Sequence, residues 1–183
     1  MSLGMRPGQV STQIIDGINF AWNMDKMIVC AAGTSFVGVN DIFDVVFPAN
    51  HPNTIAVTGI KEPTFYPNPL SSEDVACSDC HYGADVWFSV IMERSGSGND
   101  DRTTLATSCD GDVPTYSSGT SCATATFAGM AALIWANQGV DTPRDIIISS
   151  LIQASSNNLN PHPYLGFGWV DINAALQLSL IHI

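Results

Sequence analysis

Apolar residues follow two different spacings along this chain of 183 residues. Between residues 10 and 25 they recur every three or four positions, which predicts an amphipathic helix. The apolar positions of this helix are Ile14, Ile15, Ile18 and Trp22. Short continuous apolar runs predict buried strands, and these runs cover residues 27–32, 54–58 and 85–90. Buried strands mixed with amphipathic helices are typical of an α/β protein with a mainly parallel sheet.

The second half of the chain has a longer helical pattern. A helix is predicted over about residues 121–138, and its expected buried face comprises Ala123, Phe127, Met130, Ala131 and Ile134. Another helix is predicted to begin at Thr142, which suits the N-cap. Pro143 then suits the first helical position, and Asp145 stands three residues after the cap. Residues 173–180 are predicted to form a short terminal helix.

Composition and charge narrow the class of protein. Apolar residues make up 45% of the chain and charged residues only 13%, which indicates one folded globular domain. The net charge is −11, from 17 acidic and 6 basic residues. Such a surface repels phosphates and anionic lipid, so neither nucleic acid nor a membrane is an expected partner. No apolar run reaches the roughly 18 residues of a membrane span.

The first residues do not resemble a secretory signal. Met-Ser-Leu-Gly has neither a basic start nor an apolar core of sufficient length. The chain is therefore either intracellular or a part of a longer natural protein, and the motifs described below favour the second interpretation.

The five cysteines are Cys30, Cys77, Cys80, Cys109 and Cys122. Cys30 lies in an apolar run and is expected to be a small buried hydrophobe. Cys77, Cys80 and Cys109 lie in polar sequence and are candidates for one disulfide of undetermined pairing. Cys77-Ser-Asp-Cys80-His81 also matches the pattern of c-type haem attachment, and zinc is a further alternative. Plain loop cysteines or a disulfide are favoured, because a strand-like run follows rather than the helix that such a haem site opens.

An acidic stretch at residues 95–101 is the one segment whose composition suggests calcium. It lacks the spacing of an EF-hand, so a solvated loop is the expected structure and no cofactor is assigned.

The segment from Ser118 to Gly129 reads Ser-Gly-Thr-Ser-Cys-Ala-Thr-Ala-Thr-Phe-Ala-Gly. Gly119 permits a close turn, and Ser121 follows at the start of an apolar helix. The N-terminus of a helix offers unpaired N–H groups and a positive dipole end. These features suit a nucleophile that attacks a carbonyl whose oxygen becomes negative. The alternative is that Ser121 only caps the helix.

This segment resembles the serine motif of the subtilases, the subtilisin-like serine proteases of peptidase family S8. The matching residues are Gly119, Thr120, Ser121, Ala123, Ala128 and Gly129. Ala125 replaces the usual proline, and Thr126 replaces a histidine that often follows it. Both departures lie beyond the nucleophile.

Five other segments resemble subtilase motifs in the family's order, so the resemblance extends over nearly the whole chain. They are residues 1–4, 28–33, 47–57, 82–86 and 166–175. Met1-Ser2-Leu3 also fits a cloning leader, in which case the match begins at Gly4. The resemblance implies that residues 1–183 form the C-terminal half of a subtilase catalytic domain. The implied fold is a partial three-layer α/β/α sandwich.

The resemblance implies a triad in the chain order Asp, His, Ser, with Ser121 as nucleophile. The family's Asp and His motifs precede the segment that residues 1–4 match, and none of the four histidines here lies in a His-Gly-Thr motif. These histidines are His51, His81, His162 and His182. We therefore expect the base to come from a preceding segment and this chain alone to react near the background rate.

The resemblance also assigns an oxyanion site and substrate contacts. Gly33-Thr34 stands where the family usually has Gly-Asn, so Thr34 is either a second oxyanion donor beside the Ser121 N–H or a loop residue without a catalytic role. Ser2, Leu3 and Gly4 are expected to pair with an extended peptide substrate. Together with these, the expected pocket walls are Ala31, Ala32 and Gly33.

The expected function is hydrolysis of peptide bonds in the full-length parent, which would act on peptide or protein substrates. The parent is expected to be extracellular. The alternative is a non-catalytic module that keeps the fold, and Thr34 is consistent with it. Because the implied N-terminal half contributes central strands, we also expect an exposed sheet edge that favours self-association.

Overall fold

The computed structural model describes residues 10–34, 44–61, 76, 77, 79–93, 104–106, 115–117 and 119–179. Its helices are α1 (Thr12–Asn23), α3 (Thr120–Gln138), α4 (Arg144–Gln153) and α5 (Ile172–Ser179). Its strands are β1 (Val29–Ala31), β2 (Ile55–Lys61), β3 (Val86–Glu93), β4 (Thr104–Ala106) and β5 (Thr115–Ser117). Every helix and strand predicted from the apolar pattern is present, with ends shifted by a few residues.

Within the described residues, β1, β2 and β3 form a parallel sheet in that order. Val29 of β1 pairs with Ile55 of β2, and Val57 of β2 pairs with Phe88 of β3. The central strand β2 is buried from Ile55 to Ile60, because both faces of the sheet are covered. The prediction of a mainly parallel α/β fold is therefore confirmed.

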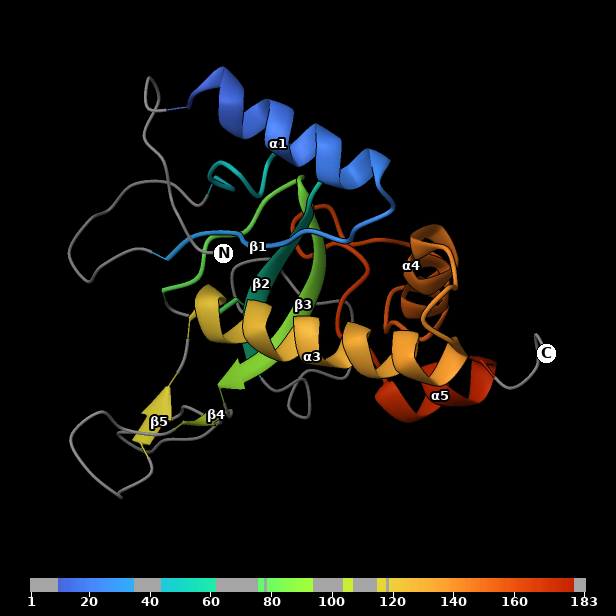
Figure 1. Cartoon of the computed structure of the whole chain (residues 1–183). Coiled ribbons are helices and arrows are strands. Elements are labelled where there is room, and N and C mark those ends of the chain that lie inside the picture. The colour runs from blue at the N-terminus through green and yellow to red at the C-terminus, as the bar shows by residue number, and fades with distance from the viewer. Residues whose placement is uncertain are drawn as a thin grey trace.

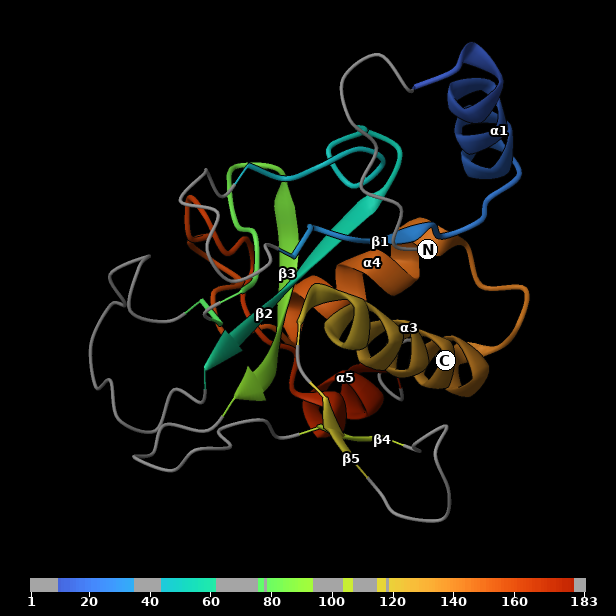
Figure 2. The same ribbon diagram turned by 90° about the vertical axis from the view of Figure 1, so that its left-hand side faces the viewer.

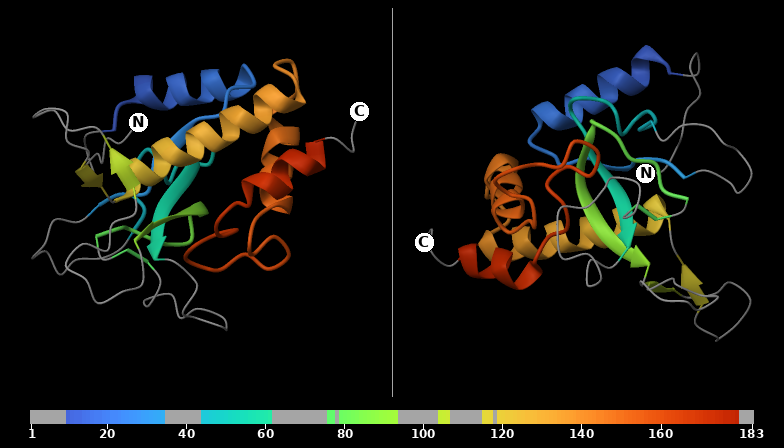
Figure 3. Two further views of the ribbon diagram at one scale, coloured as in Figure 1. Left: turned by 90° about the horizontal axis from the view of Figure 1, so that it is seen from below. Right: turned by 180° about the vertical axis from the view of Figure 1, so that it is seen from behind.

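One face of the sheet packs against the helix that begins with the Gly119–Ser121 motif. Figure 1 shows α3 crossing in front of β2 and β3, and the view from behind in Figure 3 shows the strands in front of α3. The rings of Phe88 and Phe127 stack in this interface with their centroids 4.7 Å apart. The predicted buried face of α3 is confirmed except for Met130, which is half-buried. Helices α1 and α5 lie on opposite sides of α3 (Figure 2).

The other face of the sheet is covered by loops. Cys30, Ala32 and Ala56 pack there with Val45 and Ala49. The segment that follows α4 returns beside β3, where Phe167 N donates to Trp87 O at 2.8 Å and Ser89 N donates to Gly168 O at 2.9 Å. The predicted closing motif at residues 166–175 therefore lies next to β3.

The start of α4 differs from the prediction. The N-cap is Pro143, which has no side chain that can cap, and Thr142 Oγ1 donates to Gln138 O at 3.0 Å instead. The Arg144 N–H that begins the helix donates to the carboxylate of Asp25 at 3.1 Å. The prediction of Thr142 as N-cap was wrong because the capping group comes from the turn after α1, 119 residues earlier.

Candidate active site

Ser121 occupies the second position of α3 and is exposed. The residue before the helix is Gly119, with φ 93° and ψ 165°, a backbone conformation that a residue with a Cβ rarely adopts. The helix begins at Thr120 rather than at Ser121 as predicted. The alternative that Ser121 is the cap was therefore wrong, and its side chain projects from the first helical turn.

Thr34 lies beside the first residue of this helix. Its Oγ1 accepts a hydrogen bond from Thr120 N at 3.4 Å and lies 2.9 Å from Thr120 Oγ1. Because Gly119 has no side-chain oxygen, Thr34 takes the place of an N-cap residue from 86 positions away. The structure thus brings the two predicted catalytic positions, Thr34 and Ser121, to the same end of α3.

The direction of the bond between the two threonine hydroxyls determines what Thr34 has left to donate. Thr120 Oγ1 already accepts from Gly33 N at 3.3 Å, and either hydroxyl fits as the donor in the 2.9 Å pair. If Thr120 donates, Thr34 accepts, and the Thr34 hydroxyl proton stays available for an acceptor outside this pair. If Thr34 donates, its only proton is used inside the protein. Thr34 as a whole is an exposed residue, and its hydrogen bonds with Thr120 are partly buried.

Gly33 is held between this helix start and the ring of His81. A Cβ at Gly33 would lie 2.5 Å from His81 Nδ1, and the backbone φ of 129° also favours glycine. His81 N donates to Gly33 O at 2.8 Å, and His81 Nδ1 lies 2.9 Å from Asp44 O. Sequence analysis missed this packing, since nothing in the order of residues relates His81 to a glycine 48 positions away.

The other predicted pocket residues are only partly described. Ala31 and Ala32 are 4% and 0% exposed, so their side chains are buried and any contact with a substrate there would involve the backbone. Ser2, Leu3 and Gly4 lie outside the described residues, as do the acidic stretch 95–101, Cys109 and His182.

The two remaining described histidines make local contacts. His51 Nδ1 accepts from Asn53 N at 3.1 Å, and its ring meets Phe47 edge to face. His162 Nδ1 accepts from Tyr164 N at 3.3 Å. These contacts are consistent with loop roles for both residues.

The Cys77-x-x-Cys80-His81 motif is more buried than its polar sequence suggested, with Cys77 and Cys80 exposed by 2% and 0%. The ring of His81 packs on Gly33, whereas the thiols pack on Gly59. In the part of the chain that the structure describes, no group of three His, Cys, Asp or Glu side chains is arranged to hold a metal. The prediction that Cys30 is a buried hydrophobe is confirmed at 1% exposure.

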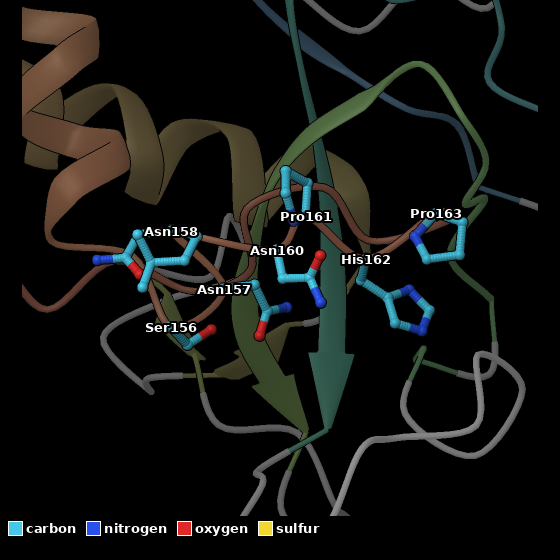
Figure 4. Close-up of a pocket in the computed structure, with 8 residues that line it drawn as sticks. Ser156, Asn157, Asn158, Asn160, Pro161, His162 and Pro163 are labelled. Carbon is cyan, nitrogen blue, oxygen red and sulfur yellow. The ribbon is translucent and has the colours of Figure 1, made fainter.

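A surface cavity of about 460 Å³ lies elsewhere, along the loop between α4 and α5. Figure 4 shows Asn157, Asn160 and His162 along this loop. The lining comprises residues 156–163 and includes neither Thr34 nor Ser121, so the cavity is separate from the candidate active site.

Comparisons with known proteins agree with this arrangement. The model of the subtilase family matches residues 1–170. A thermophilic serine proteinase of Bacillus sp. (strain AK1) is 32% identical over 129 residues, which are 70% of this chain and 26% of that protein. A solved protease of Pseudoalteromonas arctica PAMC 21717 superposes with a TM-score of 0.70 and 25% sequence identity. The match covers 97% of this chain and 50% of the protease chain. A lanthipeptide protease superposes with a TM-score of 0.67 and 16% sequence identity. The match covers 89% of this chain and 54% of the protease chain, and at this identity it supports the fold alone.

The fold and the serine at the start of α3 are those of a subtilisin-like serine protease. The chain belongs to the subtilase family. It spans 26% of the curated relative and about half of each solved structure. Among the described residues, no helix has both the length and the apolar character needed to cross a membrane.

Proposed function

We propose that the full-length protein of which this chain is part is a serine endopeptidase with Ser121 as its nucleophile. The observation that supports this most strongly is the exposed Ser121 in the first turn of α3, beside the Thr34–Thr120 pair. The N-terminus of α3 offers N–H groups and a positive dipole end to an oxygen that gains negative charge. Family membership supports serine protease chemistry in general.

In the proposed reaction, Ser121 Oγ bonds to the carbonyl carbon of the scissile peptide while a base removes its proton. The carbonyl oxygen becomes an oxyanion, which the Ser121 N–H stabilises, with Thr34 Oγ1 as the second donor. The peptide C–N bond then breaks, the base returns the proton to the leaving amine, and water hydrolyses the acyl-enzyme. Thr34 serves as a donor only when Thr120 donates within the threonine pair.

We assign the base and its orienting aspartate to residues that precede these 183 in the full-length protein. The family's triad order of Asp, His, Ser supports this assignment. Without a base, Ser121 stays a weakly nucleophilic alcohol, so the isolated chain is expected to be inactive.

The proposed substrate is an extended stretch of a peptide or protein. Ser2, Leu3 and Gly4 would pair with its backbone, and the Ala31–Gly33 segment would wall the pocket before the scissile bond. Because this segment would meet the substrate through its backbone and carries no charge, it favours uncharged side chains in that pocket.

A non-catalytic subtilase-like module is the second candidate function. The observation that favours it is the engagement of Thr34 Oγ1 with Thr120, where the family usually has an asparagine. Such a module would keep the fold and bind peptides without cleaving them.

We also propose export of the full-length protein and, for the isolated chain, self-association through an edge of the sheet. The net charge of −11 is consistent with a secreted protein. Sedimentation velocity of the isolated chain should show dimers or larger species, and a single monomeric species at all concentrations would refute the self-association.

The proposed activity is tested by peptide hydrolysis with the full-length protein. Ser121→Ala should lower kcat by about 10⁶, the loss known for subtilisin when its serine is removed. Ser149→Ala is the matched control. Ser149 is also an exposed helical serine, and its hydroxyl donates to Asp145 O within the same helix, α4. Equal activity in the Ser121→Ala variant and the wild type would refute the assignment, and binding without cleavage by the wild type would support the second candidate.

A further inference from the structure

Two buried cysteines lie at the ends of a tight turn beside β2. Cys80 N donates to Cys77 O at 3.0 Å, which closes a turn of four residues. Such a turn brings its first and last Cα atoms within about 7 Å of each other. A disulfide needs a Cα separation of about 4.4–6.8 Å, so the backbone is already near the geometry that a disulfide requires.

The side chains of these two cysteines converge on one point. A Cβ added to Gly59 would lie 2.7 Å from Cys80 Sγ and 3.2 Å from Cys77 Sγ. Both residues are free thiols in the structure. The absence of a side chain at Gly59 therefore leaves room for both sulfur atoms side by side within the apolar core.

We propose that Cys77 and Cys80 form a disulfide in the mature protein. The inference does not depend on the proposed protease activity, because it concerns only the turn and its two thiols. It selects one pairing among the three cysteines that the sequence left open, and Cys109, which lies outside the described residues, is left without a part in the bond.

The oxidant is a disulfide, either glutathione disulfide or an oxidised thiol oxidoreductase. One cysteine thiolate attacks a sulfur of this oxidant, forms a mixed disulfide and releases the first thiolate. The second cysteine loses its proton and attacks the protein sulfur, which forms the Cys77–Cys80 bond and releases the second thiolate. Two protein thiols are oxidised, and one disulfide is reduced to two thiols.

The reaction belongs to folding rather than to the folded state. The neighbouring Cys80 thiol and burial raise the pKa of the Cys77 thiol, so its reactive thiolate is scarce once the turn is packed. The bond therefore forms while the turn brings the two cysteines together but before they are fully buried.

The turn is also connected to the candidate active site. Cys77 N donates to Gly59 O at 3.1 Å at its start, and Thr58 Oγ1 donates to His81 O at 2.5 Å just after its end. His81 N in turn donates to Gly33 O. A disulfide across the turn would thus stabilise the segment that carries Gly33 and Thr34.

The test is thiol trapping on the full-length protein, secreted into a bacterial periplasm and purified without reductant. The protein is denatured, alkylated and mapped by mass spectrometry. The peptide with Cys77 and Cys80 should be about 2 Da lighter than the dithiol and take no label, and after reduction it should take two labels. Cys30 and Cys122 should take label in both cases. Labelling of Cys77 and Cys80 before reduction, or a bond from either to Cys109, would overturn the proposal.

A second measurement guards against variants that fold poorly. Reductant should lower the melting temperature of the full-length wild-type protein by about 5 °C, given a bond that closes a short loop. The Cys77→Ser/Cys80→Ser double variant should show no such response, whereas Cys30→Ser should respond as the wild type does. An equal response in the wild type and the double variant would also refute the proposed bond.

Discussion

At the scale of single residues, the proposed oxyanion site depends on the pair Thr34 and Thr120. Thr34 Oγ1 accepts the Thr120 N–H at 3.4 Å, which satisfies an N–H that the glycine before the helix cannot satisfy. The same hydroxyl is the proposed second oxyanion donor. Thr34 therefore has a structural role as a cap, which the geometry establishes, and a proposed catalytic role, which kinetics can test.

Thr34→Val separates these two roles in the full-length protein. Loss of the cap should lower the free energy of unfolding by about 1 kcal/mol. Loss of the donor should lower kcat by at least about tenfold with little change in KM, because the contact forms only with the oxyanion. Denaturant unfolding and peptide hydrolysis measure the two effects.

Thr142→Val is the control for this substitution. Its hydroxyl also bonds backbone, at Gln138 O, but it lies at the other end of α3. A Thr34→Val variant that loses stability and keeps the kcat of the wild type would show that Thr34 is only a cap.

At the scale of helices, α3 and α4 are capped at their N-termini in the same way. Each begins after a residue without a capping side chain, Gly119 or Pro143, and each first N–H is satisfied from a distant segment. Thr34 serves α3 and Asp25 serves α4. The arrangement couples the start of each helix to the packing of another segment, so the helices form together with the tertiary structure.

Asp25 tests this coupling at α4. Asp25 has a φ of 60°, which asparagine and glycine tolerate better than alanine. Asp25→Ala should lower the free energy of unfolding by about 2 kcal/mol, because it removes the cap and strains the backbone. Asp25→Gly should lose about 1 kcal/mol, since only the cap is removed, and Asp25→Asn should lose least.

Denaturant unfolding of the three variants orders these effects. Asp141→Ala, at an exposed position before α4, is the control and should be neutral. Equal stability of the Asp25→Ala and Asp25→Asn variants would contradict the proposed cap.

Phe127 tests the packing of α3 on the sheet. It is fully buried and stacks on Phe88, so Phe127→Ala should lower the free energy of unfolding by about 3–5 kcal/mol. Leu133, on the same helix, is 50% exposed, and Leu133→Ala should lose about 1 kcal/mol or less. Similar losses in both variants would contradict the assigned face of the helix.

Predictions from sequence succeeded where the signal was local and failed where it depended on a distant partner. The apolar runs that became β1, β2 and β3 and the serine motif on α3 were identified correctly. β2 is longer than predicted, because Gly59 looks like a turn residue but lies in a strand buried on both faces. The cap from Asp25 and the packing of His81 on Gly33 leave no periodic pattern, and no local rule anticipates them.

At the scale of the whole molecule, the proposed function has these residues supply a nucleophile and its helix to a longer catalytic unit. The match with the solved protease from Pseudoalteromonas arctica covers 97% of this chain but only half of that protease. The proposed base and aspartate would complete the triad from the remaining part. The central claim therefore concerns what Ser121 does when that part is present.

The most direct test is fluorophosphonate labelling of the full-length protein, followed by peptide mapping. We expect one adduct on the peptide that contains Ser121, none in the Ser121→Ala variant, undiminished labelling in Ser149→Ala, and none on the isolated 183-residue chain. Equal labelling of the wild type and the Ser121→Ala variant would contradict Ser121 as the nucleophile. Full labelling of the isolated chain would contradict the assignment of the base to residues outside it.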